Sequence, residues 1–376
     1  MSEAPRAPGE SRSRGPSHRR RPPGETPAYA ALDLGTNNCR LLVATPTSGG
    51  FRVVEAYSRI VRLGEGLVAS GRLSDAAMER SMAALKVCAE KIRRRRTVRV
   101  RAIATQACRM ADNGQAFVDR VAEETGLRLQ IITPREEAQL SVAGCLNLLD
   151  RSAEAALVVD VGGGSTELSW VDLKGEGLDT HPRQFAAWKL PIKAWVSIPI
   201  GVVTLAEKFP EEGPRDVWFR SMVDAVKERI ADFPHAEALR PVFEAGRAQL
   251  VGTSGAITSL AGLHLDLPRY DRNRVDGLWM TRSECEAAAN RLLALTTAER
   301  AQQPCIGPDR ADLVLAGAAI LQAVQELWPC DSVRVADRGL REGILMSLMS
   351  DQQPRKPRRR RRRGGAGRAS TAQAAE

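Results

Sequence analysis

The chain has 376 residues, 43% of them hydrophobic, and a formal net charge of +10, which suits a globular protein with room for two domains. The charge lies at the two ends: residues 1–27 carry +3 and residues 351–376 carry +7, so residues 28–350 are neutral. This argues against a DNA-binding domain, whose basic residues lie on the folded part. No stretch reaches the roughly 20 apolar residues that span a bilayer, and there is no signal peptide, so we expect a cytoplasmic protein without a membrane span.

Both ends, 1–27 and 351–376, are rich in Pro, Gly, Ser and Arg and have almost no apolar residues. Such segments cannot bury enough surface to fold, so we predict two disordered basic tails. They either keep the protein in solution or contact RNA or another polyanion, and their composition fits both. The seven cysteines show no CxxC spacing, which favours reduced thiols over a zinc site or a disulfide framework.

In chain order, residues 28–46 and 50–64 predict a β-meander with a glycine turn. Apolar spacing and end signals then predict a helix over 74–96, a strand over 98–105, a helix over 113–126, a strand over 127–133 and a helix over 135–149. A second unit begins at Ala156 with another strand, glycine turn and strand. Residues 248–263 predict a third strand and glycine turn followed by a helix, and 310–327 and 333–349 predict a closing helix, strand and helix.

The two glycine turns follow one pattern. Asp33 precedes "LGTN" and Asp160 precedes "VGGGST", each at the end of a predicted strand. Backbone N–H groups in such turns bind phosphate oxygens, helped by hydroxyls such as those of Thr36, Ser165 and Thr166. A β-hairpin that binds nothing can have the same sequence pattern, so a single glycine turn is weak evidence for phosphate binding. The repetition predicts a pair of phosphate clamps that face each other across a cleft.

The acidic residues beside the turns indicate a metal. A carboxylate close to phosphate is repelled unless a divalent cation lies between them, and hard oxygen ligands favour Mg²⁺. Glu167 is a candidate for a further ligand or for a group that orients water. Alternatively, Asp33 and Asp160 only cap their turns. None of the four histidines lies in a glycine turn, so carboxylates remain as the candidate bases. Glu136 and Glu137 lie in the first turn of a predicted helix, where the helix dipole favours an acidic residue whatever its function.

Eight stretches in order over about 28–350, among them "ALDLGTNNCRLLVA", "REEAQLSVAG", "VVDVGGGSTELSW" and "VADRGLREGIL", together resemble the exopolyphosphatase/guanosine pentaphosphate phosphohydrolase (Ppx/GppA) family of the actin-like and sugar-kinase-like superfamily. The resemblance implies an α/β fold of two duplicated ribonuclease-H-like domains with an interdomain cleft. The domains would span 28–150 and 151–331, and 332–350 could return to the first. The chain stops soon after "REGIL" and so resembles the short form, which lacks the C-terminal helical domains.

The resemblance also implies a Mg²⁺-dependent hydrolase that cleaves the terminal phosphoanhydride of inorganic polyphosphate, guanosine pentaphosphate or both. Glu137 matches the general base that acts on water. Asp33, Asp160 and Glu167 match metal and water ligands. The expected phosphate contacts are Gly35, Thr36, Asn37, Arg109, Gly162, Gly163, Gly164, Ser165, Thr166 and Arg341.

Three positions depart from the family pattern. Asn38, Thr204 and Asp276 stand where the family is expected to have Ser, Arg and His, so the preferred substrate stays open. Members of the family often dimerise, which makes a homodimer the expectation here.

Two other functions remain as alternatives. The first is a non-catalytic sensor that binds polyphosphate or a nucleotide and recruits RNA or a partner through its tails. Retention of Glu137, Asp160 and Glu167 argues against it, because a pure binder needs no carboxylate to position water. The second is a kinase that uses "GTSGAITS" as a nucleotide-binding loop. It is the weaker alternative, because "EEA" together with "DVGGGSTE" is the pairing found in the phosphohydrolase family of the resemblance.

Overall fold

The computed structural model describes residues 26–175, 190–231, 233 and 236–350. Apart from residues 26 and 27, the two tails predicted to be disordered lie outside these residues.

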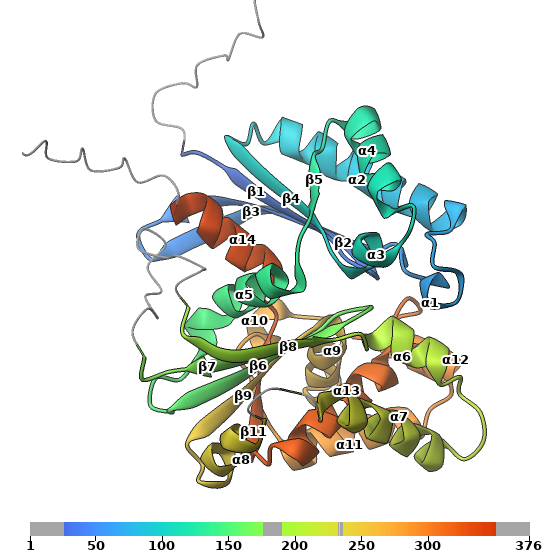
Figure 1. The fold of residues 1–376 in the computed structure, drawn as a ribbon, viewed down its shortest axis with the longest axis vertical. Coiled ribbons are helices and arrows are strands. Elements are labelled where there is room, and N and C mark those ends of the chain that lie inside the picture. The colour runs from blue at the N-terminus through green and yellow to red at the C-terminus, as the bar shows by residue number, and fades with distance from the viewer. Residues whose placement is uncertain (1–25, 176–189, 232, 234–235, 351–376) are drawn as a thin grey trace, which may run out of the picture.

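Two mixed β-sheets form the centre of the protein, one in the upper and one in the lower half of Figure 1. The first has the order β3-β2-β1-β4-β5, with β1 antiparallel to β2 and parallel to β4. The second, β10-β11-β9-β6-β7-β8, repeats this pattern, with β6 antiparallel to β7 and parallel to β9. The predicted α/β fold of two duplicated domains is therefore confirmed. The strands are β1 Tyr29–Leu34, β2 Asn38–Thr47, β3 Gly50–Ile60, β4 Arg99–Ala104, β5 Leu129–Ile131, β6 Ala155–Val161, β7 Thr166–Asp172, β8 Ile192–Ile198, β9 Ala248–Thr253, β10 Trp279–Thr281 and β11 Ser332–Ala336.

The helices cover the faces of the two sheets (Figure 1). As predicted, Ser74 caps the first long helix, and Gly126, with a positive φ of 75°, ends the next predicted one. The helices are α1 Leu67–Ser70, α2 Asp75–Arg94, α3 Gln106–Met110, α4 Gly114–Thr125, α5 Pro134–Cys145, the 3-10 helix Leu146–Leu148, α6 Val202–Lys208, α7 Arg215–Ile230, α8 Ala236–Glu244, α9 Gly255–His264, α10 Arg272–Val275, α11 Arg282–Leu293, α12 Thr297–Ala301, α13 Val314–Leu327 and α14 Leu340–Ser350.

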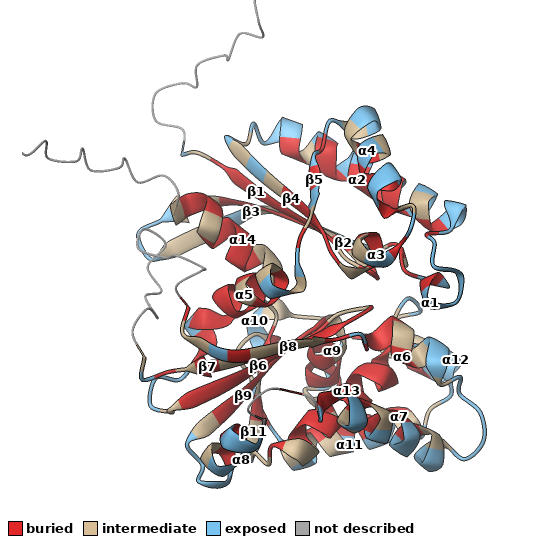
Figure 2. Cartoon of the chain, viewed as in Figure 1, coloured by how far each residue is buried: buried red, intermediate tan, exposed pale blue. Residues whose placement is uncertain are grey.

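The strands β1 and β6 are buried on both faces, as the interior of each sheet in Figure 2 shows. In β1, Ala30 and Leu32 pack in a core with α2 and α4, whereas Tyr29 and Ala31 pack in a second core with α5 and α14. Because side chains alternate along a strand, Asp33 belongs to the face of Tyr29 and Ala31. That face is turned toward the other sheet.

The same alternation occurs in β6. Leu157 and Val159 join the core of the second domain, and Ala156 and Val158 join the core that contains α5 and α14. By the two-residue period, Asp160 lies on the face of Ala156 and Val158. A single apolar layer shared by both sheets therefore carries Asp33 from one side and Asp160 from the other.

The helices α5 and α14 cross closely within this shared layer, between the two sheets in Figure 1. A Cβ atom on Gly144 would lie 1.9 Å from the carbonyl oxygen of Gly339, and one on Gly343 would lie 1.9 Å from that of Leu140. The crossing thus requires glycine at both positions. Of the closing elements, β11 pairs within the second sheet, whereas α14 packs against β1 of the first.

Among the residues that the structure describes, no helix combines the length and the apolar character needed to cross a membrane. All seven cysteines are free thiols, and six of them are buried.

We expect Gly343→Ala to lower the free energy of unfolding by about 1–3 kcal/mol or more, because the added methyl group meets backbone rather than a side chain that can move. Urea denaturation measures this change. Gly49→Ala is the matched control, since a Cβ there has no atom within 4 Å, and it should change stability by less than about 0.5 kcal/mol. Equal stability of the two variants would contradict the tight crossing of α5 and α14.

Candidate functional site

A cleft of about 550 Å³ lies between the two sheets. Most of the predicted site residues line it: Asp33, Gly35, Thr36, Asn37, Glu137, Asp160, Gly162, Gly163, Gly164, Ser165, Glu167 and Arg341. The two glycine turns, far apart in the sequence, therefore meet in one cavity.

The glycines of the second turn let the two turns pack against each other. A Cβ on Gly163 would lie 3.0 Å from the Asn37 nitrogen and from Cβ of Thr36, and one on Gly164 would lie 2.9 Å from Oγ1 of Thr36. None of Gly162, Gly163 and Gly164 has a positive φ. The bare backbone at 163 and 164 therefore serves close approach of the two turns rather than a left-handed conformation.

The turns present unused hydrogen-bonding groups. The N–H groups of Gly35 and Gly162 close their own turns by donating to Asn38 O at 2.8 Å and to Ser165 O at 2.9 Å. Those of Thr36, Asn37, Gly163 and Gly164 have no acceptor in the described part of the chain. Three buried side-chain atoms beside them also lack a partner there: Thr36 Oγ1, Asn37 Oδ1 and Asn38 Oδ1. Buried polar groups are nearly always hydrogen-bonded, so this set indicates a polar ligand.

Two predicted phosphate contacts do not line the cleft. The hydroxyl of Thr166 donates to the carbonyl of Ile200 at 2.7 Å. Arg109 donates to Glu137 Oε2 at 3.3 Å and to Gln106 Oε1 at 2.8 Å. Arg109 thus contacts the cleft through the side chains of Glu137 and Gln106, both of which line it.

Asp160 and Glu167 stand directly opposite each other on β6 and β7. Burial raises the pKa of Asp160 to about 6, although Ser141 donates a hydrogen bond to it. Burial and the charge of Asp160 raise the pKa of Glu167 to about 7, although Ser197 donates to Glu167 at 2.7 Å. Like charges opposite each other in a sheet repel, so this pair favours a bound proton or cation.

The two glutamates of the helix α5 have different surroundings. Glu136 is partly exposed and forms an ion pair with Arg101. Glu137 is 7% exposed and lines the cleft. Burial, followed by the charge of Glu167, raises the pKa of Glu137 well above its ordinary value, while Arg109 opposes this. Only Glu137 is placed to act on a group in the cleft.

The carboxylates fit a magnesium ion that is completed by other ligands. Asp33 is 8% exposed, its Oδ1 has no hydrogen-bond partner, and burial raises its pKa. In the described residues, no three Asp, Glu, His or Cys side chains come together closely enough to hold a metal. Mg²⁺ usually binds to one or two carboxylates together with water and phosphate oxygens. The site therefore suits an ion that arrives with a phosphorylated ligand.

Three arginines of the cleft have side chains that form no hydrogen bond or ion pair with the described residues: Arg40, Arg310 and Arg341. Burial lowers the pKa of Arg341, while the charges of Glu342 and Asp33 partly offset this effect. Sequence reasoning predicted Arg341 but missed Arg40 and Arg310. Arg40 stands opposite Asp33 in the β1–β2 hairpin, so counting the hairpin register would have found it. Arg310 carries no such local signal.

Two serines that hold the carboxylates were also missed. Ser141 follows Glu137 by four residues on α5 and so lies on the same face of the helix, a spacing that the sequence displays. Ser197 reaches Glu167 from β8, and no local pattern predicts that pairing.

The three residues that depart from the family pattern, Asn38, Thr204 and Asp276, lie in different environments. Asn38 Oδ1 is among the unpartnered cleft atoms. Thr204 caps the helix α6, since the N–H of Gly201 donates to its hydroxyl at 2.8 Å. Asp276 accepts three hydrogen bonds from the Arg338 guanidinium and one from the Asp337 N–H at 3.0 Å.

The chain is similar to known proteins over most of its length. A model of the Ppx/GppA phosphatase family matches residues 42–352. Exopolyphosphatase 2 of Mycobacterium tuberculosis is 31% identical over 334 residues, which cover 85% of this chain and 98% of that protein. A solved Ppx/GppA family member from Aquifex aeolicus is 27% identical, with a TM-score of 0.69, and the match covers 88% of this chain and 100% of that one. A solved exopolyphosphatase-like protein is 29% identical, with a TM-score of 0.74 and coverages of 87% and 100%.

We expect the metal-free protein to lose stability between pH 4.5 and 7 through Glu167. Below that range the group is protonated in both the folded and the unfolded chain. Within it the unfolded chain ionises first, because the folded pKa is about 7, and the loss reaches at most about 3 kcal/mol above pH 7. Urea unfolding in EDTA at pH 5 and pH 8 measures the effect as the difference between Glu167→Gln and the wild type.

The stability of Glu167→Gln relative to the wild type should therefore rise from pH 5 to pH 8. Glu228→Gln, which replaces an exposed carboxylate of α7, should show the same difference at both pH values. A pH-independent difference for Glu167→Gln would contradict the raised pKa.

Proposed function

Since this chain belongs to the Ppx/GppA phosphatase family, we propose that it hydrolyses the terminal phosphoanhydride of inorganic polyphosphate with Glu137 as the general base. The observation that carries the proposal is the position of Glu137, a buried carboxylate in a cleft whose two glycine turns offer N–H groups without acceptors. The relative named exopolyphosphatase 2, of which the match covers 98%, supports polyphosphate as the substrate. Guanosine pentaphosphate contains the same type of bond and is the substrate to compare.

The first task of the site is to hold a chain of negative charges. In the proposed mechanism, the free N–H groups of the two turns bind the oxygens of the terminal phosphate, and Arg341 binds an oxygen of the next phosphate. Both are preformed and partly shielded from water, which strengthens their interaction with the negative charge of the bound phosphate chain.

The second task is to position and deprotonate one water molecule. Glu137 would accept its proton, while Arg109, which donates to Glu137 at 3.3 Å, keeps the carboxylate oriented toward the cleft. An anhydride has a good leaving group, so alignment of the chain and neutralisation of charge are the main requirements.

One or two of the carboxylates Asp33, Asp160 and Glu167 would hold Mg²⁺ together with water and phosphate oxygens of the substrate. Bound there, the ion would neutralise phosphate charge and lower the repulsion between substrate and carboxylates. Ser141, Ser165 and Ser197 orient Asp160 and Glu167 by hydrogen bonds, as partners behind metal ligands commonly do.

We expect Glu137→Gln to reduce phosphate release from polyphosphate by about 10²–10⁴-fold, because the amide cannot accept the proton of water. Release of inorganic phosphate in the presence of Mg²⁺ is the measurement. Glu136→Gln is the matched control, since Glu136 is paired with Arg101, and it should retain activity within about threefold.

Full activity of Glu137→Gln would overturn the assignment of the base. Tight binding of polyphosphate to the wild type, without release from either polyphosphate or guanosine pentaphosphate, would favour a sensor instead.

We expect EDTA to abolish phosphate release and Mg²⁺ to restore it. Asp33→Asn should raise the Mg²⁺ concentration for half-maximal activity by about tenfold or more, because it removes one carboxylate from a site that has few ligands. Titration of activity with Mg²⁺ tests both statements. Activity that persists in EDTA would exclude the metal, and an unchanged half-maximal concentration would exclude Asp33 as its ligand.

A further inference from the structure

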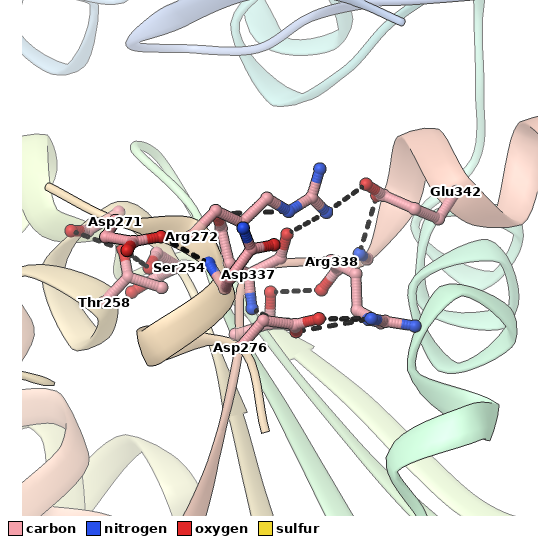
Figure 3. Close-up of polar contacts among 12 residues, drawn as sticks. Ser254, Thr258, Asp271, Arg272, Asp276, Asp337, Arg338 and Glu342 are labelled. Carbon is pink, nitrogen blue, oxygen red and sulfur yellow. Dashed lines mark hydrogen bonds and ion pairs between the residues drawn. The ribbon is translucent and has the colours of Figure 1, made fainter. Parts of the chain in front are cut away.

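A network of charged side chains joins the second domain to the start of α14, and Figure 3 shows it. Arg272, the first residue of α10, donates to Oε1 of Glu342 at 2.8 Å and contacts the carboxylate of Asp337 at 3.4 Å. Oε2 of Glu342 accepts from the N–H of Gly339 at 3.0 Å. Both oxygens of Glu342 are therefore occupied.

The charges of two arginines, Arg341 and Arg272, lower the pKa of Glu342, and its side chain pairs with Arg272. Glu342 is 5% exposed, and it follows Arg341 directly in the chain. Its charge raises the pKa of Arg341, yet the side chain of Arg341 forms no hydrogen bond or ion pair within the described ranges. The partner of Glu342 is Arg272, which leaves the guanidinium of Arg341 available in the cleft.

We propose that Arg272 is a positioning residue for phosphate binding: by pairing with Glu342, it prevents this buried carboxylate from pairing with Arg341. This inference rests on the proposed function, since it takes the phosphate chain as the ligand of Arg341.

The physical reason is the instability of an unpaired buried charge. A carboxylate as buried as Glu342 must keep a cation or lose several kcal/mol of stability. Without Arg272, Glu342 is still close enough to Arg341 for the charge of Arg341 to lower its pKa. Glu342 then draws Arg341 away from the substrate, and the cleft loses a positive charge although Arg341 itself is still present.

The segment 337–342 is also the place where the chain passes from β11 in the second sheet to α14 on the first. Asp276 holds Arg338 of this segment, and Thr253 donates to the carbonyl of Arg338 at 2.8 Å. Cys145 of α5 contacts the same carbonyl at 3.4 Å. Arg272 also donates to the carbonyl of Asp337, but the contacts at Arg338 hold the segment without it. Removal of Arg272 should therefore change the pairing of Glu342 more than the path of the backbone.

The test is a set of substitutions read by polyphosphate affinity and turnover. Arg272→Met should raise KM about tenfold or more and change kcat by less than about threefold, the pattern of lost ground-state binding. The dissociation constant of polyphosphate, measured by calorimetry in the Glu137→Gln background, should rise by a similar factor. Arg272→Lys, which keeps one charge, should lie between Arg272→Met and the wild type.

Two double substitutions separate this role from a structural one. Arg272→Met combined with Glu342→Gln should return KM to within about threefold of the wild type, because no buried charge then competes for Arg341. Arg272→Met should have no further effect in the Arg341→Met background. Arg274→Met is the matched control, since Arg274 lies exposed on the same helix turn, and it should leave KM unchanged.

An unchanged dissociation constant in Arg272→Met would overturn the inference, and so would additive effects of Arg272→Met and Arg341→Met. Failure of the double substitution at 272 and 342 to restore affinity would also overturn it. Because affinity is measured without turnover, these outcomes stay distinct from failure of the proposed function, which would appear as absence of phosphate release from the wild type.

Discussion

The two-residue period of the first strand in each sheet is the constraint on which the site depends. In β1 and β6, alternate side chains enter the core of their own domain or the layer shared by both domains. An acidic residue near the end of each strand, on the shared side, therefore faces the opposite domain. The repeated hairpins place Asp33 and Asp160 in one cleft because both sheets turn the same face toward α5 and α14.

This arrangement gathers negative charge in a buried place. Glu137 enters from α5, and Glu167 enters from β7 opposite Asp160. Each of these carboxylates has a raised pKa because burial and its neighbours oppose ionisation. Such a cluster is unfavourable for folding on its own. It is understandable in a site that binds a cation and a phosphate chain, whose charges complement those of the carboxylates and of the unpaired arginines.

Close backbone contacts hold the two halves of the cleft in register. Gly163 and Gly164 let the two turns touch, and Gly144 and Gly343 let α5 and α14 cross. The same crossing brings Glu342 next to the cleft, where Arg272 from the second domain pairs with it. The passage of the chain between the sheets therefore produces both the close backbone contacts around the cleft and the pairing of Glu342 with Arg272, which leaves Arg341 unpaired.

The sequence by itself determined many of the local elements, the duplicated turns with their acidic residues and, through the ordered motifs, the family and its α/β fold. These features depend on periodicity and turn chemistry, which act over a few residues. The ordered motifs also indicated Glu137 rather than Glu136 as the base, and Glu137 does line the cleft. Only the tertiary structure decided that the hydroxyl of Thr166 is bound to Ile200 and that Gly163 and Gly164 serve contact between the turns. It alone brought Arg310, Ser197 and Arg272 to the site, because these residues lie on segments far along the chain from the residues they meet there. Local sequence patterns carry no information about such proximity.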